Sequence, residues 1–217
     1  MSEVTEHYKT RDFWIRESVL YEEPSFRLRK CARLLDELTR GEERDLLDLG
    51  CGPAALRRCL KPNVNYHGVD IAIHEPAPYL LERDCVANPI AFADKKFDIV
   101  VALGVFEYMG QHQLQKFVEI SRILKEDGTF IMSYINFKHV RRVVYPIYNN
   151  VQSIDEVVRS LEHVFRVEKC VPVSHHWRHK QPGRNALPGI QMRLNWNIPY
   201  LSSWLAVEYF CVCSRRT

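Results

Sequence analysis

The stretch that decides the fold is Leu46-Leu47-Asp48-Leu49-Gly50-Cys51-Gly52-Pro53-Ala54. An apolar strand ends here in two closely spaced glycines, whose missing Cβ permits a tight turn and lets a ligand approach the backbone. The carboxylate of Asp48 would repel a pyrophosphate at this turn, but it suits the ammonium group of an amino acid. Asp70 follows at the end of the next expected strand, where a carboxylate accepts hydrogen bonds from both ribose hydroxyls. The pair predicts a ligand that joins a nucleoside to an amino acid.

Apolar runs and helix-type periodicities alternate along the rest of the chain. This order predicts an α/β, Rossmann-like fold with a mostly parallel seven-stranded sheet, helices on both faces and an antiparallel C-terminal edge strand. The expected strands span residues 45–49, 66–71, 79–83, 97–103, 129–135, 165–173 and 206–213. The expected helices span 12–39 with a break at Pro24, 54–60, 113–124 and 153–163, and a capping-box pattern opens the last of them.

The sequence contains no repeat, low-complexity segment or evident linker, so residues 1–217 are expected to form a single domain. Residues 1–41 predict an N-terminal helical cap, residues 42–137 a cofactor-binding core, and residues 138–217 a C-terminal half. Within that half, residues 174–205 are interpreted as an insertion on the side where the second reactant binds.

The composition narrows the class of protein. With 46% hydrophobic and 26% charged residues the chain is an ordinary globular sequence, and it shows neither a long apolar run nor a signal-peptide pattern. We therefore expect a cytoplasmic protein that does not enter a membrane. Seven cysteines, an odd number in mostly apolar or helical contexts, indicate packed free thiols, and no metal site is expected.

The net charge of +3 is too small to predict nucleic-acid binding, but it is unevenly distributed. Residues 138–217 hold 12 Lys and Arg against 5 Asp and Glu, a net charge of +7, so the first 137 residues carry −4. The basic half is compatible with an anionic reactant and equally with a solvated surface.

The glycine turn resembles motif I of the class I S-adenosylmethionine-dependent methyltransferases, and later segments resemble further motifs of that superfamily in the same order. These segments are Tyr66 to Asp70, Arg83-Asp84-Cys85, Phe97 to Tyr108 and Ile123 to Phe130. The resemblance implies S-adenosyl-L-methionine as cofactor and S-adenosyl-L-homocysteine as its product. With Trp14 added as a lid from the first helix, the expected cofactor-binding residues are Trp14, Asp48, Gly50, Cys51, Gly52, Asp70, Ile71, Asp84, Cys85 and Leu103.

Three features depart from the family pattern. Ala54 replaces the third glycine of motif I, and Tyr108 stands where many relatives carry histidine. Only 13 residues, two of them proline, separate Asp70 from Asp84, which is too few for the usual helix. A loop is therefore expected beside the adenine, whose amino group the resemblance assigns to Asp84.

The expected reaction is methyl transfer to an O or N nucleophile of a small-molecule acceptor. A neutral amine needs only a proton sink, whereas a hydroxyl profits from a general base such as histidine. The candidate bases are His139, His175 and His176. Further candidates supply charge or aromatic surface for an anionic or aromatic acceptor, and for each of them an ordinary packing or surface role is the alternative: Glu107, Tyr108, Tyr134, Arg141, Trp177 and Arg178.

Two other functions stay open on the sequence. Residues 133–142 resemble a segment of the MetW-like proteins of methionine biosynthesis, which permits a non-catalytic, cofactor-binding partner or regulatory subunit of another enzyme. An NAD-dependent oxidoreductase is disfavoured by Asp48 and by Ala55 at the last glycine of the dinucleotide pattern. The chain is expected to be a monomer or homodimer that binds neither nucleic acid nor membrane.

Overall fold

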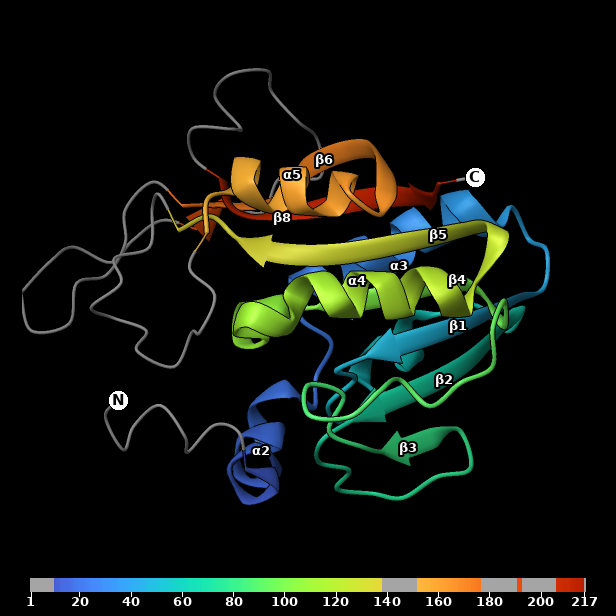
Figure 1. The fold of residues 1–217 in the computed structure, drawn as a ribbon. Coiled ribbons are helices and arrows are strands. Elements are labelled where there is room, and N and C mark those ends of the chain that lie inside the picture. Colours follow the sequence, from blue (N-terminus) through green and yellow to red (C-terminus); the bar gives the residue numbers. More distant parts are fainter. Residues whose placement is uncertain (1–9, 138–151, 177–190, 193–205, 217) are drawn as a thin grey trace, which may run out of the picture.

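Eight strands form one sheet in the order β3-β2-β1-β4-β5-β8-β6-β7 (Figure 1). The computed structural model describes residues 10–137, 152–176, 191–192 and 206–216. Strands β1 to β5 pair in parallel, whereas β8 is antiparallel to both β5 and β6, and β7 is antiparallel to β6. The strands are β1 Arg44–Leu49, β2 Val64–Asp70, β3 Leu80–Glu82, β4 Phe97–Leu103, β5 Leu124–Ile135, β6 Phe165–His176, β7 Gln191–Met192 and β8 Ala206–Arg215.

This architecture confirms the predicted Rossmann-like sheet, which is mostly parallel and has antiparallel C-terminal strands. Two details differ from the prediction. The two-residue β7 adds an eighth strand, and β8 lies between β5 and β6 rather than at the edge. Ala206 and residues 208–213 of β8 are all buried, as expected for an internal strand of a sheet that is covered on both faces.

Helices cover both faces of the sheet, as predicted. α4 (Gln113–Ile123) and α5 (Ile154–Glu162) pack on one face, and α3 (Phe26–Thr39) and the 3-10 helix η2 (Ala55–Cys59) pack on the other (Figure 1). The first face buries a group of aromatic rings with centroids 4.7–6.3 Å apart, from Phe106, Phe117, Phe130 and Phe165.

The N-terminal helical region divides close to the predicted break at Pro24. α2 (Arg11–Glu17) begins after Thr10, whose Oγ1 accepts the N–H of Phe13, and it continues into the 3-10 helix η1 (Ser18–Tyr21). α3 begins after Ser25, whose hydroxyl accepts a backbone N–H of the first turn. The capping box predicted at the start of α5 is present.

The helix predicted over residues 54–60 is wrong in type and length, since only the five-residue η2 forms there. Ala54 takes a left-handed conformation with φ of 54°, and β2 already begins at Val64, so little chain remains for a longer helix. Residues 71–79 form turns and bends, as expected from the short spacing between Asp70 and Asp84.

The order of the strands places a ligand site. The chain runs outward from β1 to β2 and β3 and then returns to β4 on the other side of β1. Ligands of open parallel sheets bind outside the carboxyl ends of the strands at such a reversal. Asp48 and Asp70, near the ends of β1 and β2, lie at this point.

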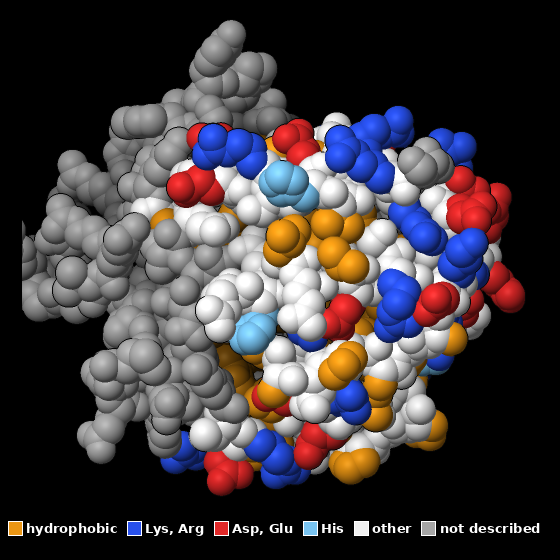
Figure 2. All heavy atoms as spheres, in the orientation of Figure 1, with side chains coloured by type: hydrophobic (Ala, Val, Ile, Leu, Met, Phe, Trp, Pro, Cys, Tyr) orange, Lys and Arg blue, Asp and Glu red, His pale blue; other side chains and the backbone are white. Residues whose placement is uncertain are grey.

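The surface over α4 and α5 presents charges of both signs. Figure 2 shows Lys and Arg side chains interspersed with Asp and Glu across the coloured part of this face. Within the described ranges, no helix combines the length and the apolar character that crossing a bilayer requires.

Candidate active site

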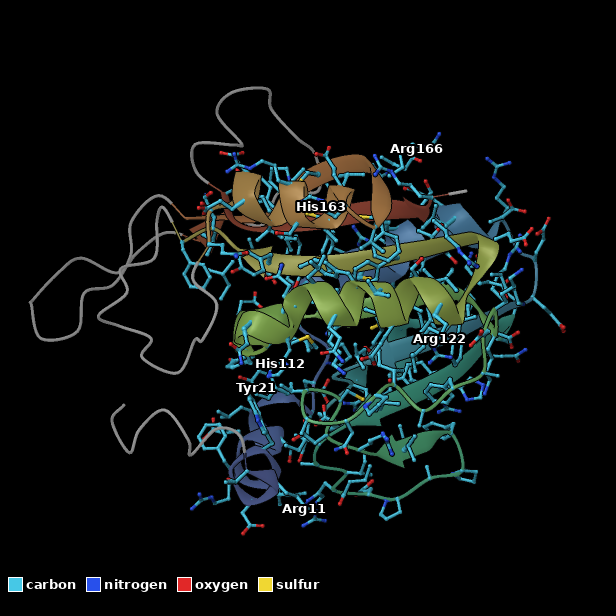
Figure 3. All side chains as sticks on the ribbon, viewed as in Figure 1. Arg11, Tyr21, His112, Arg122, His163 and Arg166 are labelled. Atoms are coloured by element: carbon cyan, nitrogen blue, oxygen red, sulfur yellow. The ribbon has the colours of Figure 1, made fainter. Side chains whose placement is uncertain are left out.

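A cavity of about 760 Å³ lies at the carboxyl ends of β1, β2 and β4. The turn after β1 and the end of β2 line one part of it, and α2, η1, the start of α3 and the turn after β4 line the rest. Figure 3 shows two of the lining residues, Tyr21 of η1 and His112 of η4 (Gly110–His112), at this end of the molecule. Arg122 lies at the opposite end of α4 (Figure 3).

The fold gathers the predicted residues around this one cavity. All ten candidate cofactor-binding residues line it, and so do Glu107 and Tyr108. Trp14 is 34 positions before Asp48 in the sequence, and α2 brings it to the same cavity. Residues from the strand ends and from the N-terminal helices therefore line the same cavity.

The glycine turn after β1 is held tightly by backbone contacts. Gly50 and Cys51 both donate their N–H groups to the carbonyl of Val69, at 2.7 and 3.1 Å. Gly50 has φ of 75°, and a Cβ at this position would come within 2.3 Å of a methyl group of Val105. A residue other than glycine would therefore be strained and would displace the turn after β4.

Asp48 is a buried carboxylate, with 4% of its surface exposed. Its Oδ2 accepts a hydrogen bond of 2.8 Å from the hydroxyl of Tyr66 on the neighbouring strand. Burial raises the pKa of Asp48 to about 7, against the lowering effect of the Tyr66 hydroxyl. A cation placed beside Asp48 would favour the ionised carboxylate.

Asp70 connects the two loops that end β1 and β2. Its Oδ2 accepts the N–H of Gly52 at 2.7 Å, and its Oδ1 accepts the N–H of Ala72 at 3.1 Å. Burial raises the pKa of Asp70, and the two N–H donors oppose that shift. Each carboxylate oxygen can accept a second hydrogen bond, so both remain able to receive a hydroxyl group.

Asp84 orders the loop after β3. Its Oδ1 accepts the N–H groups of Val86 and Ala87, at 2.8 and 3.0 Å, which closes a short turn at the rim of the cavity. Asp84, Cys85, Val86 and Ala87 all line the cavity. The structure therefore places this predicted residue at the site, with one carboxylate oxygen engaged by the loop.

Another residue that lines the cavity, Arg27, forms an ion pair that the sequence analysis missed. Arg27 of α3 donates through Nη1 to Oε1 of Glu208 on β8, at 2.9 Å. Although burial lowers the pKa of Arg27, the charges of Glu208 and Glu107 raise it overall, so the guanidinium stays ionised. The Nε atom of Arg27 is buried and has no hydrogen-bond partner among the described residues.

Glu107 is a second buried acid at the cavity, and its side chain has no exposed surface. Its Oε1 accepts the N–H of Ile135 at 3.0 Å. Its Oε2 has no hydrogen-bond partner among the described residues. Burial raises the pKa of Glu107 to about 7, and the charge of Glu208 adds to the shift while Arg27 opposes it.

Aromatic side chains complete the wall next to Glu107. The rings of Trp14 and Tyr108 meet edge to face, with centroids 5.3 Å apart. Tyr21 also lines the cavity, and 47% of its surface is exposed. This part of the cavity therefore combines aromatic surface with a carboxylate.

The other predicted acceptor residues are either absent from the lining of the cavity or outside the described residues. Tyr134 is not among the lining residues, since it is fully buried in the core on the α4–α5 face, where its hydroxyl accepts the N–H of Gln152 at 3.2 Å. The position of Tyr134 on β5 directs it to that face. His175 and His176 end β6, and their side chains are outside the described part of the structure, as are the whole residues His139, Arg141, Trp177 and Arg178.

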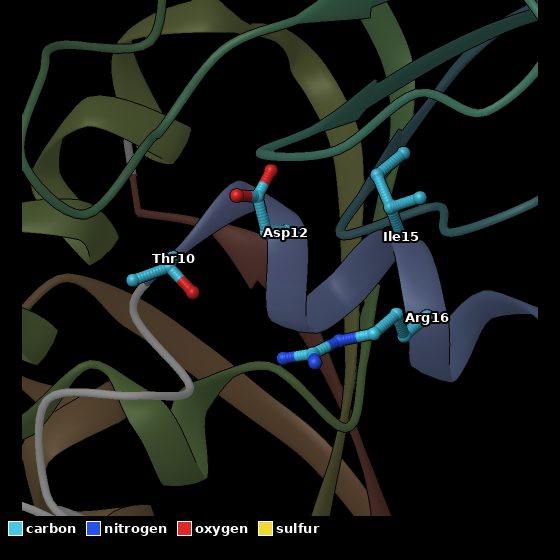
Figure 4. Close-up of a pocket in the computed structure, with 4 residues that line it drawn as sticks. All are labelled: Thr10, Asp12, Ile15 and Arg16. Atoms are coloured by element: carbon cyan, nitrogen blue, oxygen red, sulfur yellow. The ribbon is translucent and has the colours of Figure 1, made fainter.

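A second hollow, of about 480 Å³, lies against α2 alone. Thr10, Asp12, Ile15 and Arg16 line it (Figure 4). It lacks the strand ends, the glycine turn and the buried acids that surround the first cavity. We therefore take the cavity at the strand ends as the functional site.

The sheet is mostly parallel, with the antiparallel strand β8 next to β5, and it carries a glycine turn and buried acids at its strand ends. These features define a methyltransferase-type Rossmann fold. Comparison with known families agrees, since residues 47–132 match the family described as Methyltransferase domain. The matched segment holds the glycine turn, Asp48, Asp70 and Glu107, so this part of the chain resembles a methyltransferase domain. No curated protein sequence matches it.

Solved structures share this fold. A chain of the complex that contains the Haloferax volcanii Trm112 methyltransferase activator is 18% identical, with a TM-score of 0.68 over 97% of this chain and 98% of that one. A SAM-dependent methyltransferase from Archaeoglobus fulgidus is 16% identical, with a TM-score of 0.63 over 88% and 95%. One from Aquifex aeolicus is 14% identical, with a TM-score of 0.60 over 92% and 97%.

Proposed function

We propose that this protein binds S-adenosyl-L-methionine in the cavity at the strand ends and transfers its methyl group to a nitrogen or oxygen of a small molecule. One observation carries the proposal: two ionic side chains of opposite sign, Asp48 and Arg27, line the same cavity as the carboxylate of Asp70. A ligand with an ammonium, a carboxylate and a ribose matches these three groups. Asp48 is buried without a cation in hydrogen-bond contact among the described residues, and Arg27 has an unused buried N–H.

Each part of the donor has a partner of suitable chemistry. Asp48 would receive the ammonium group, Arg27 the carboxylate, and Asp70 the ribose hydroxyls. Ile71, Asp84 and Cys85 border the place expected for the adenine, and Leu103 and Trp14 would exclude water near the reacting sulfur. The sequence predicted Asp48 and Asp70 as partners of the ammonium group and the ribose; Arg27 is added by the geometry.

The donor supplies an activated methyl group on a sulfonium, so the task of the chain is to align and shield it. Holding the nucleophile in line with the methyl carbon and sulfur removes much of the entropic barrier. The turns after β1 and β4 are locked by hydrogen bonds and close packing, which suits such alignment. The aromatic wall of Trp14, Tyr21 and Tyr108 is the surface on which an acceptor would lie.

Replacing Asp70 by alanine is expected to weaken donor binding by about 1–3 kcal/mol, or about 5- to 150-fold, because the ribose hydroxyls lose their acceptor. Isothermal calorimetry with S-adenosylmethionine, S-adenosylhomocysteine and NAD measures this loss directly. Asp127→Ala, an exposed position in β5, is the control. Unchanged donor affinity in a folded Asp70→Ala protein, or binding of NAD by the wild type in place of the donor, would contradict the proposed site.

A second candidate is a cofactor-binding subunit that works with a partner protein. The specific support is the similar chain whose structure was determined in a complex with a methyltransferase activator. Mass-spectrometric detection of methyl transfer by the isolated chain separates the two functions. Donor binding without turnover on any of a panel of amines, phenols and acids would favour the partner-dependent function, and affinity purification would then identify the partner.

A further inference from the structure

We infer that the methyl acceptor is an amine that enters as an ammonium cation, and that Glu107 binds it and takes its proton. The inference rests on the proposed function and deepens it by naming the acceptor class. Three observations support it: an unpartnered carboxylate oxygen, the balance of charge around it, and the aromatic wall beside it.

The first observation is the hydrogen bonding of Glu107. Its Oε1 is satisfied by Ile135 at 3.0 Å, while Oε2 is buried and unpartnered within the described residues. A carboxylate oxygen that is withdrawn from water without a donor is costly. Because Glu107 lines the cavity, a ligand that donates an N–H would remove this cost. A carboxylate or phosphate ester has no proton to donate and would be repelled.

The second observation is the charge around Glu107. In the described structure the titratable groups close to it are Arg27 on α3, Glu208 on β8 and Tyr134 on β5. The guanidinium of Arg27 is already hydrogen-bonded to Glu208 at 2.9 Å. One cation therefore faces two carboxylates, which leaves a negative charge that an ammonium ligand would balance.

The third observation is the aromatic wall. Trp14, Tyr21 and Tyr108 line the cavity together with Glu107. Faces of tryptophan and tyrosine attract cations, and an ammonium group next to a carboxylate and aromatic rings is a recurrent arrangement in recognition sites. The expectation of an anionic acceptor came from the positive charge of residues 138–217 and from Arg141 and Arg178, and these two arginines lie outside the described residues.

The proton balance of the reaction is simple. The ammonium transfers one proton to Oε2 of Glu107, which leaves a neutral amine and a protonated carboxyl group. The nitrogen lone pair then forms the new C–N bond, the C–S bond breaks with its electron pair left on sulfur, and the product is a methylated ammonium ion. An ordinary glutamate is a weak base for an amine with a pKa of about 10, and the raised pKa of Glu107, about 7, reduces that mismatch.

The test uses two probes of similar size and opposite charge, benzylammonium and benzoate. The full-length protein is saturated with S-adenosylhomocysteine, and each probe is titrated by calorimetry at pH 7 in two buffers of different ionisation enthalpy. We expect benzylammonium to bind at least about tenfold more tightly than benzoate. Its binding should release up to about half a proton, because a nearby cation lowers the pKa of Glu107.

Glu107→Gln keeps the oxygen that accepts from Ile135 and removes the charge. It should abolish both the tenfold preference and the proton release, whereas the surface control Glu126→Gln should keep them. Benzoate binding as tightly as benzylammonium, no binding of either probe, or a Glu107→Gln variant that keeps both signals would each overturn the inference. Failure of S-adenosylhomocysteine to bind the wild type would instead overturn the proposed function on which it rests.

Discussion

Replacing Arg27 by methionine is expected to lower the free energy of unfolding by about 3 kcal/mol and the melting temperature by about 6–12 °C. The substitution keeps most of the packing but leaves Glu208, with only 12% of its side chain exposed, without its cation. The buried carboxylates of Glu107 and Asp48 also lose a compensating charge. The estimate lies at the lower end of values for buried pairs, because 28% of the Arg27 side chain is exposed.

Thermal and denaturant unfolding of the variant, the wild type and Arg29→Met measure this effect. Arg29 is an exposed neighbour on α3 that donates to the carbonyl of Pro24, so its replacement should cost little. Adding Glu208→Gln to Arg27→Met should restore part of the loss, since the remaining amide needs no cation. Lowering the pH to 5 should narrow the gap, because Glu107, whose pKa is about 7, then binds a proton. A loss below about 1 kcal/mol would show that solvent already screens the pair.

Asp48→Asn is expected to raise the stability of the folded protein at high pH and to weaken the binding of S-adenosylmethionine. The folded pKa of Asp48 is about 7, whereas the unfolded value is 3.8, so the folded state binds the proton more tightly. The protonated Asp48 therefore stabilises the folded state. This stabilisation is fully present below about pH 4 and is lost as the pH rises to about 7. Asparagine has no such loss, and above pH 8 the variant should exceed the wild type by up to about 4 kcal/mol.

The same variant should bind S-adenosylmethionine about 10- to 100-fold more weakly, because the ammonium group loses a charged acceptor. Denaturant unfolding between pH 5 and pH 8 and calorimetric titration measure the two effects. Asp45→Asn, at the other end of β1 and with 36% of its side chain exposed, is the matched control. A stability difference that does not change with pH would refute the raised pKa, and full donor affinity would refute the role of Asp48.

That the glycine turn, Asp48 and Asp70 meet at one cavity could be predicted, because local sequence determines where these residues lie. The glycine turn, Asp48 and Asp70 each follow a strand within a few residues, and parallel strands bring their carboxyl ends together. The buried ion pair could not be predicted in this way. Arg27 and Glu208 are 181 positions apart, and only the fold joins them. A charged residue within the apolar run of β8 was the one available signal for Glu208.

Other differences have similar physical origins. The helix after the glycine turn was predicted from its residues, but its length is limited by the start of β2 at Val64. Tyr134 was chosen for its chemistry, while its position on β5 sends the side chain into the core. The internal place of β8 follows from pairing partners far away in the sequence, which no local pattern specifies.

The position of β8 also has a consequence for biosynthesis. β8 is the last described strand in the chain, yet it separates β5 from β6 and supplies Glu208, the partner of the cavity residue Arg27. The half of the sheet from β3 to β5 can pair as it emerges from the ribosome, whereas β6 has no neighbour in the main sheet until β8 has been made. The glycine turn is therefore synthesised early, and the ion pair of Arg27 with Glu208 can form only after β8 has been made. Nascent chains that stop before Ala206 should hold the glycine turn without the carboxylate that pairs with Arg27.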